Sequence, residues 1–359
     1  MKSPRPAEAV EGYLPQLDGV RAIAVLLVLA QHWVANKFKI GAPLGFVGVT
    51  MFFVLSGYLI SRILFAARER KETHGVTIAT SLKIFYARRF LRIFPIYYLT
   101  VAALYFSGDA RARKAIFWCL TYTVNFYFMH EPDHESIGHL WTLAIEEQYY
   151  LIYPLIVLAC TVPQRRYALW LMCGSALATR ILLHLLGVGP EENKYFTLSC
   201  FDSFAMGGML AHLEAEHGKE RIQAFFRRPL ALLGTLGIVA AFGALGLLLG
   251  EKGSMRIVWF RSVISLASLY VIGVALIESR WLALALGNRP IVYIGKISYG
   301  IYLYHMYAGR LLDPVAPGWR KLPYAVVLTA VFTTTMLVAT ASWYLIEKPL
   351  NGLKRHFKY

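Results

Sequence analysis

Apolar stretches long enough to cross a lipid bilayer recur along this 359-residue chain from one end to the other. Hydrophobic side chains make up 57% of the sequence, which is more than an ordinary soluble domain carries. A bilayer leaves backbone polar groups no water to bond, so such stretches fold as helices. The pattern predicts an all-α, polytopic integral membrane protein, with no long hydrophilic segment left over for a second domain.

We expect about ten transmembrane helices in a single domain that covers residues 1–359. The predicted spans are 20–36, 46–62, 93–107, 140–160, 167–187, 197–213, 229–249, 256–277, 290–307 and 323–346. A further segment, 115–130, is apolar and aromatic but has only about 16 residues, near the lower limit for a span.

The basic residues of the loops decide whether 115–130 crosses. If it does not, the loops on the N-terminal side hold roughly twice as many Lys and Arg residues as the opposite loops. If it does, the two sides hold equal numbers. Because cytoplasmic loops are the basic ones, we expect both termini to be cytoplasmic and 115–130 to lie in the interface or re-enter from the outer face. The net charge of +16 has the same explanation, so we expect no nucleic-acid partner.

Two polar side chains interrupt the first apolar helix. Arg21 lies near its start and His32 lies eleven residues later. At about 100° per residue the two share one helix face and stand roughly 16 Å apart. Both are costly in hydrocarbon unless they face a polar cavity or a partner, which predicts a functional site. The alternative is that Arg21 reaches the headgroups and His32 sits at the opposite interface.

The segment YARRFLRIFP carries a second basic group. Arg89 and Arg92 are three residues apart, so their guanidinium groups project from nearly one face, and Pro95 allows a kink or a break. Planar guanidinium groups suit bidentate contacts with phosphate. The alternative is a basic cluster that is attracted to anionic lipid.

Carboxylates are concentrated in SIGHLWTLAIEEQYYLIYPL. His139, Thr142 and Glu146 follow the i, i+3, i+7 spacing of one helical stripe near the outer face, and Glu147 and Tyr150 begin an adjacent stripe. Two neighbouring carboxylates at a membrane entrance are costly unless one is paired or protonated. The alternative is an interfacial cap with an aromatic belt.

Other polar residues also lie within apolar spans. An ion pair of Asp202 with Arg180 or with Arg261 is the simplest interpretation, and a role in a polar cavity is the other. Gly207 and Gly208 beside Asp202 allow a close helix approach.

Ser56 in VLSGYLI could be a nucleophile, although we favour a hydroxyl that bonds a helix carbonyl. The sequence contains no GxSxG elbow, no HExxH and no Gly-rich phosphate loop. The four cysteines show no paired spacing, and we expect no metal site.

Several blocks, in the right order, resemble the membrane-bound acyltransferase family 3 proteins, which O-acylate sugars and other hydroxyl acceptors. The blocks are LDGVRAIAVLLVLAQH, FVGVTMFFVLSGYLIS, YARRFLRIFPIYYL, HLWTLAIEEQYY, YIGKISYGIYLYHMY and TASWYLIEKPLN. The resemblance runs from Leu17 to Pro349. The chain departs from the family at Ala22, where Gly is usual, at Thr50, where an acidic residue is common, and at Thr142, where Ser is more usual. We expect no fused SGNH esterase-like domain.

The resemblance implies an acyl-coenzyme A co-substrate, with acetyl the expected group, and no bound cofactor. The implied donor-binding residues are Arg21, Arg89 and Arg92, reached from the cytoplasm. We expect His32 to act as base or proton relay, and Glu146 to serve the acceptor side, with Glu147 as second choice. The supporting polar residues expected around the cavity are Asp18, Ser56, His139, Trp141, Glu147, Asp202, Ser298, Tyr299, His305 and Glu347.

The expected function is transfer of an acyl group to a hydroxyl of a saccharide, such as a cell-surface polysaccharide precursor, in a bacterial inner (plasma) membrane. One alternative is an acyltransferase for a small molecule such as a macrolide. Another is a transporter or flippase of glycolipid precursors, because ten helices with buried charges also suit a substrate pathway.

Overall fold

The computed structural model describes residues 13–131, 136–248 and 256–357, and all regular elements within these ranges are helical. The α-helices are α1 (Pro15–Ala30), α2 (Asn36–Phe38), α3 (Leu44–His74), α4 (Ile78–Phe106), α5 (Ala110–Lys114), α6 (Ile116–Leu120), α7 (Val124–Tyr127), α8 (Leu140–Ala159), α9 (Val162–Leu185), α10 (Pro190–Tyr195), α11 (Phe201–His217), α12 (Lys219–Phe226), α13 (Pro229–Leu248), α14 (Arg256–Ala275), α15 (Arg280–Leu286), α16 (Arg289–Lys296), α17 (Ser298–Tyr304), α18 (Tyr324–Ser342) and α19 (Lys348–Gly352). Two π-helical turns are η1 (Gln31–Ala35) and η5 (Trp343–Glu347). The expected all-α fold is confirmed.

Among the described residues, five helical stretches are long and apolar enough to cross a membrane. They are Pro15–Phe38, Leu44–Arg70, Val162–Leu185, Val258–Ala275 and Tyr324–His356. A sixth is formed if α12 and α13, which meet at a 62° bend, together make one span. Helices α4 and α8 carry charged side chains within their apolar sequence, and α11 has only 17 residues. The count of ten crossings therefore stays a prediction.

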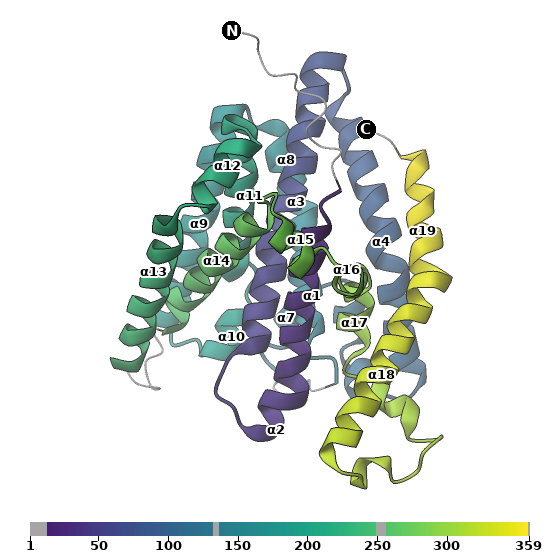
Figure 1. Cartoon of the computed structure of the whole chain (residues 1–359). Coiled ribbons are helices and arrows are strands. Elements are labelled where there is room, and N and C mark those ends of the chain that lie inside the picture. The colour runs from purple at the N-terminus through teal and green to yellow at the C-terminus, as the bar shows by residue number, and fades with distance from the viewer. Residues whose placement is uncertain (1–12, 132–135, 249–255, 358–359) are drawn as a thin grey trace.

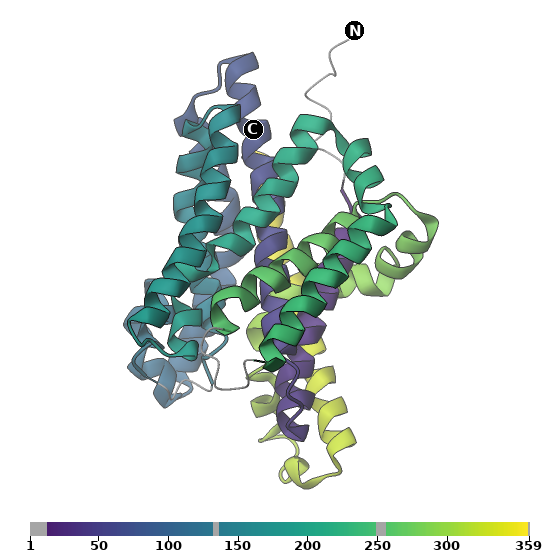
Figure 2. The same ribbon diagram turned by 90° about the vertical axis from the view of Figure 1, so that its left-hand side faces the viewer.

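Helix α3 is the central element of the bundle (Figure 1). Its 31 residues measure roughly 46 Å, and it packs against α1, α8, α11 and α14. Its C-terminal end forms a hairpin with α4 at the top of Figure 1, the end toward which α19 also points. Figure 2 shows α13 and α14 on one flank of this bundle, while α18 and α19 lie on the opposite flank in Figure 1.

Glycines bring α3 and α11 into backbone contact. A Cβ atom on Gly57 would collide with the carbonyl of Phe204, and one on Gly207 would collide with the carbonyl of Val54. Gly208 is similarly crowded by side chains of the neighbouring helices. The close approach expected at Gly207 and Gly208 is therefore present, and it fixes the depth at which the middle of α3 sits in the bundle.

The predicted span 290–307 is not one continuous helix, which corrects the expectation for this segment. Helix α16 ends at Lys296, Ile297 has non-helical dihedral angles (φ −93°, ψ 7°), and α17 begins at the next residue. Gly295 packs directly on the backbone of Asp18, so α16 lies tightly against α1. This packing holds the break in place and turns α17 toward the centre of the molecule.

Segment 115–130 forms two short helices, α6 and α7, in place of a spanning helix. Tyr122 between them has a left-handed backbone (φ 53°). A segment broken in this way agrees with the expectation that 115–130 is not an ordinary span.

The π-helical turn η1 changes the geometry assumed for the first helix. Regular α-helical structure ends at Ala30, two residues before His32. A π turn holds an extra residue and shifts the direction of the side chains that follow. The regular 100° spacing used to place Arg21 and His32 on one face therefore does not extend to His32.

Candidate active site

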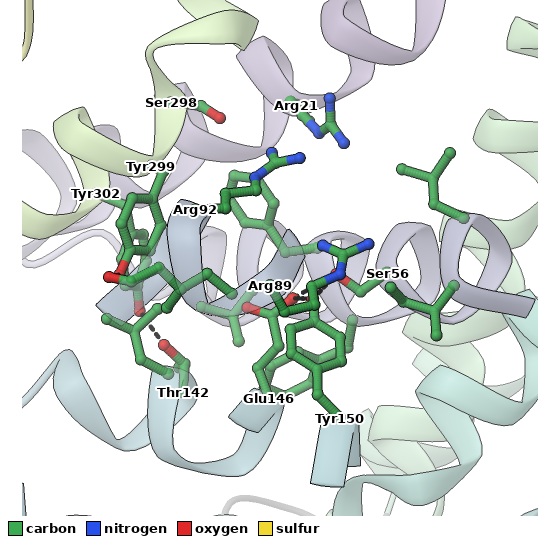
Figure 3. Close-up of a pocket in the computed structure, with 17 residues that line it drawn as sticks. Arg21, Ser56, Arg89, Arg92, Thr142, Glu146, Tyr150, Ser298, Tyr299 and Tyr302 are labelled. Carbon is green, nitrogen blue, oxygen red and sulfur yellow. Dashed lines mark hydrogen bonds between the residues drawn. The ribbon is translucent and has the colours of Figure 1, made fainter. Parts of the chain in front are cut away.

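A pocket opens among five helices, α1, α3, α4, α8 and α17 (Figure 3). It encloses about 760 Å³ of empty space, open solvent included. The residues that line it, called here the arginine pocket, are Arg21, Val49, Phe52, Phe53, Ser56, Leu59, Ile60, Arg89, Arg92, Ile93, Thr142, Leu143, Glu146, Tyr150, Ser298, Tyr299 and Tyr302. Three guanidinium groups thus face one carboxylate across a mostly apolar wall.

The predicted donor-binding arginines meet in this pocket. Arg21 comes from α1, whereas Arg89 and Arg92 come from one face of α4, and Figure 3 shows their guanidinium groups directed into the same space. Helix α4 runs through Pro95 without a break, so the two arginines keep their helical spacing. Neither Arg89 nor Arg92 forms a hydrogen bond or ion pair with another described residue, and the guanidinium carbon of Arg89 lies 5.0 Å from the ring centroid of Tyr150. Both keep donors for a ligand.

Asp18 holds Arg21 in position. Arg21 Nη1 donates to Asp18 Oδ1 at 2.5 Å, and the hydroxyl of Tyr13 donates to Asp18 Oδ2 at 2.7 Å. Burial raises the pKa of Tyr13, and the hydrogen bond to Asp18 raises it further, so the phenol remains a donor. Asp18 is 4% exposed, so this buried carboxylate holds the guanidinium group of Arg21 in one position.

A carboxylate with two hydroxyl donors lies opposite the arginines. The hydroxyls of Ser56 and Tyr150 both donate to Glu146 Oε1, and Tyr150 also lies 3.2 Å from Ser56 Oγ. The expectation that Ser56 bonds a helix carbonyl is therefore wrong, because the carboxylate is a stronger acceptor within reach. Glu146, the carboxylate preferred for the acceptor side, lines the pocket. Glu147, the second choice for that role, does not.

Three histidines gather next to the arginine pocket, and we call them the histidine cluster: His32, His139 and His305. The ring centroids of His32 and His305 are 5.0 Å apart, and those of His139 and His305 are 5.2 Å apart. His139 and His305 are 4% and 2% exposed. None of the three is among the residues that line the arginine pocket.

Backbone carbonyls fix the tautomers of two of these rings. His305 Nδ1 lies 2.7 Å from the carbonyl of Tyr302 and His139 Nε2 lies 3.2 Å from that of Leu303. Because a carbonyl only accepts, each of these ring nitrogens carries the hydrogen. The other nitrogen of each ring, His305 Nε2 and His139 Nδ1, is buried with no partner among the described residues. Each neutral ring thus presents a free lone pair.

Tyr302 and Thr142 connect the arginine pocket with the histidine cluster. Both line the pocket, and both hydroxyls reach the backbone of His139. Their hydroxyls are 2.7 Å apart, and each lies within hydrogen-bond distance of the backbone carbonyl of His139. The Tyr302 ring is 5.7 Å from His305.

The other predicted residues lie around these two regions. Ser298 and Tyr299 line the arginine pocket, whereas Trp141, Asp202 and Glu347 do not. Asp202 pairs with Arg180 at 2.8 Å, which was one of the two ion pairs expected. Glu347 is buried in the π turn η5 and accepts from Ser342 at 3.3 Å. Glu147 Oε1 is buried without a partner among the described residues.

Tyr150 and Tyr302 line the pocket but were not predicted as site residues from the sequence. Tyr150 was placed on the stripe of Glu147, yet it bonds Glu146, four residues earlier, and the i, i+4 spacing was the available signal. Tyr302 follows Ser298 at the same spacing, so both face the pocket.

Proteins of similar sequence identify the family of this chain. The family model described as "acyltransferase domain", of acyltransferase family 3, matches residues 14–344. The chain is 29% identical over 371 residues to peptidoglycan O-acetyltransferase OatA of Listeria monocytogenes, and 29% identical over 375 residues to O-acetyltransferase OatA of Staphylococcus aureus. No solved structure matches the chain.

Each of these alignments covers 96% of this chain, and the chain spans 57% of the Listeria protein and 58% of the Staphylococcus protein. The family model covers nearly all of the chain, including every residue of the arginine pocket and the histidine cluster. The chain therefore belongs to acyltransferase family 3.

Proposed function

We propose that this protein is a membrane O-acyltransferase that moves an acetyl group from acetyl-coenzyme A to a hydroxyl of a cell-surface saccharide. The observation that carries the proposal is the arginine pocket, where three guanidinium groups face a hydrogen-bonded carboxylate. The names of the two relatives, both O-acetyltransferases and one acting on peptidoglycan, support the choice of acetyl and saccharide.

The donor occupies the arginine side of the pocket. Arg89 and Arg92 bind the phosphates of coenzyme A through bidentate, charge-assisted hydrogen bonds. Arg21, held by Asp18, contacts the pantetheine or the remaining phosphate. The apolar wall formed by side chains such as Phe52 and Leu59 receives the uncharged arm of the donor.

The chemical step forms a carbon–oxygen bond and breaks a carbon–sulfur bond. The acceptor hydroxyl attacks the thioester carbonyl, its proton passes to the histidine cluster, with His32 as base or relay, and coenzyme A leaves as a thiolate. Glu146 orients the acceptor. The unpartnered lone pairs of His139 and His305 support a proton path there, because they are available as acceptors.

The proposed topology has ten crossings of a bacterial plasma membrane in one domain, with both termini cytoplasmic. The α3–α4 hairpin is rich in basic residues, and α19 points to the same end of the bundle (Figure 1), which supports this orientation. The donor then enters from the cytoplasm and the acceptor from outside.

The test uses proteoliposomes supplied with acetyl-labelled coenzyme A on one side and an oligosaccharide on the other. We expect label on saccharide hydroxyls, and loss of that label in Glu146→Gln. Arg88→Ala is the control, because Arg88 neighbours the pocket arginines but donates to the carbonyl of Phe357 and does not line the pocket. Passage of unmodified saccharide across the membrane, with no label transferred, would instead show a transporter.

A further inference from the structure

Arg261 on α14 is a buried cation that neither the arginine pocket nor the histidine cluster uses. The residue is 2% exposed, and its guanidinium carbon lies 4.6 Å from the ring centroid of Phe46 and 6.0 Å from that of Trp141. Within the described part of the chain, neither Nη1 nor Nη2 has a hydrogen-bond partner. Two aromatic faces compensate such a charge only partly, so Arg261 is a costly feature of the fold.

The nearest acid is already used by another arginine. Asp202 Oδ2 accepts from Arg180 Nη2 at 2.8 Å and from the hydroxyl of Ser262, the residue after Arg261, at 2.6 Å. Arg180 also donates to the carbonyl of Ser199 at 2.8 Å. Asp202 thus pairs with Arg180 and not with Arg261, which leaves the charge of Arg261 without an ion-pair partner among the described residues.

Thr50 on α3 is a second unpartnered group, and it lies on the face of α3 that contacts Arg261 through Phe46. Phe46, Thr50 and Phe53 follow the i, i+4, i+7 spacing of one helix face. Phe46 at one end of this stripe contacts Arg261, and Phe53 at the other end meets Trp141, the second aromatic partner of Arg261, at 6.2 Å. Thr50 lies between them, fully buried, and its hydroxyl has no partner among the described residues.

We propose that Arg261 and Thr50 form a binding site for an oxyanion, a carboxylate or a phosphate group. The guanidinium offers two parallel donors to such a group and the threonine hydroxyl offers a third. Bound oxyanion also neutralises the charge of Arg261. The site is separate from the arginine pocket, whose lining includes neither Arg261 nor Thr50.

The position of the site suggests which molecule carries the anion. Arg261 lies five residues after Arg256, the first described residue of α14, and Thr50 lies six residues after the start of α3. These separations are roughly 8 to 9 Å along each helix. Both starts lie at the end of the bundle opposite the α3–α4 hairpin (Figure 1). We assign the oxyanion to the saccharide acceptor. This assignment rests on the proposed function, whereas the site itself does not.

The site is tested by thermal unfolding of the purified full-length protein in detergent, without an acyl donor. The probes are glucuronate, glucose 6-phosphate and neutral glucose at matched ionic strength. We expect at least one of the two anionic sugars, and not glucose, to raise the Tm by a degree or more, and the anion that does so identifies carboxylate or phosphate. Equal shifts with glucose, or no shift with either anion, would overturn the proposal.

Variants locate the effect. Arg261→Gln is expected to abolish the shift, whereas Arg89→Ala, which removes a cation from the arginine pocket, is expected to keep it. Thr50→Asp supplies a built-in carboxylate, so it should raise the Tm without ligand and remove the response to anions. Thr50→Asn is the uncharged match and should do neither. A shift that survives in Arg261→Gln, or a Tm lowered equally by Thr50→Asp and Thr50→Asn, would contradict the site.

A lost acetyl transfer in the proteoliposome assay would remove the saccharide assignment and leave this binding result standing. If the anionic sugars do not raise the Tm while acetyl transfer persists, only the oxyanion site is ruled out.

Discussion

The arginine pocket and the histidine cluster are neighbours with opposite chemistry. The pocket is open, with about 760 Å³ of empty space that includes open solvent, and Arg21 alone among its three arginines forms an ion pair with a described residue. The cluster is closed, with His139 and His305 almost fully buried and one lone pair on each ring left without a partner. Tyr302 belongs to both, since it lines the pocket and packs against the rings.

This contrast fits the proposal that the arginine pocket binds the donor and the histidine cluster moves the proton. Charged groups suited to a large anionic donor lie where space is available, whereas groups suited to moving a proton lie where water is excluded. The four variants below test whether the two regions have separate roles, beginning with the largest expected effect.

Removal of His32 is expected to have the largest effect. In His32→Ala, acetyl transfer should fall by about 100-fold or more, because a positioned base contributes about 10² to 10⁴ in rate. Binding of coenzyme A should not change, since His32 does not line the arginine pocket. Transfer rates and donor binding are measured on the same proteoliposomes. Wild-type transfer by a well-inserted variant would remove the base assignment.

Arg89→Ala should weaken the donor and leave the acceptor untouched. Loss of a charge-assisted hydrogen bond costs about 1.5–3 kcal/mol, which corresponds to a rise of about 10- to 100-fold in the KM for acetyl-coenzyme A. With acetyl-pantetheine, which lacks the nucleotide, the variant and the wild type should behave alike. The role in donor binding fails if the KM for acetyl-coenzyme A does not change.

Tyr302→Phe tests the link between the two regions. The change removes the hydroxyl that lies 2.7 Å from that of Thr142 and keeps the ring against the histidines. Loss of a net hydrogen bond of about 1 kcal/mol predicts a fall in kcat of roughly 5-fold, with the donor KM unchanged. A rise in donor KM at constant kcat would assign Tyr302 to the pocket alone.

Ser56→Ala should have the smallest effect. Glu146 keeps the hydrogen bond from Tyr150 when Ser56 is lost, so transfer should fall by less than about 10-fold. Thr142→Ala, which removes another hydroxyl from the pocket lining, provides a comparison. A loss of about 100-fold or more confined to Ser56→Ala would place its hydroxyl among the reacting groups.

Much of this organisation could be predicted from the sequence because it depends on helix periodicity. The all-α fold follows from the long apolar stretches, and the shared face of Arg89 and Arg92 follows from their spacing. The glycine contact at Gly207 follows from small residues within an apolar span, and the cost of buried charge pointed to a pair of Asp202 with Arg180 or Arg261, of which Arg180 is the partner. Grouping Arg21 with the α4 arginines came from resemblance to a family, since no local pattern relates α1 to α4.

The remainder depends on irregular backbone and on contacts between distant segments. The break at Ile297 and the π turn at His32 depend on packing between helices. The periodicity of a sequence describes one helix at a time and does not predict such packing. The partner of Ser56 is Glu146, 90 residues away, so a local carbonyl was the natural but wrong expectation. The contact of His32 with His305 could not be predicted either, because the two residues belong to distant segments of the chain.

The π turn at Gln31–Ala35 makes the direction of the His32 side chain depend on the number of residues in that turn. The wide turn absorbs one extra residue, so deleting one residue there would restore uniform α-helical winding and leave the residues after the turn close to their present directions. Only the side chains within the turn, that of His32 among them, would be reoriented. Residues upstream of the turn, Arg21 among them, would keep their orientation. A single codon in this turn therefore sets the direction of His32 while the helix on either side keeps its register.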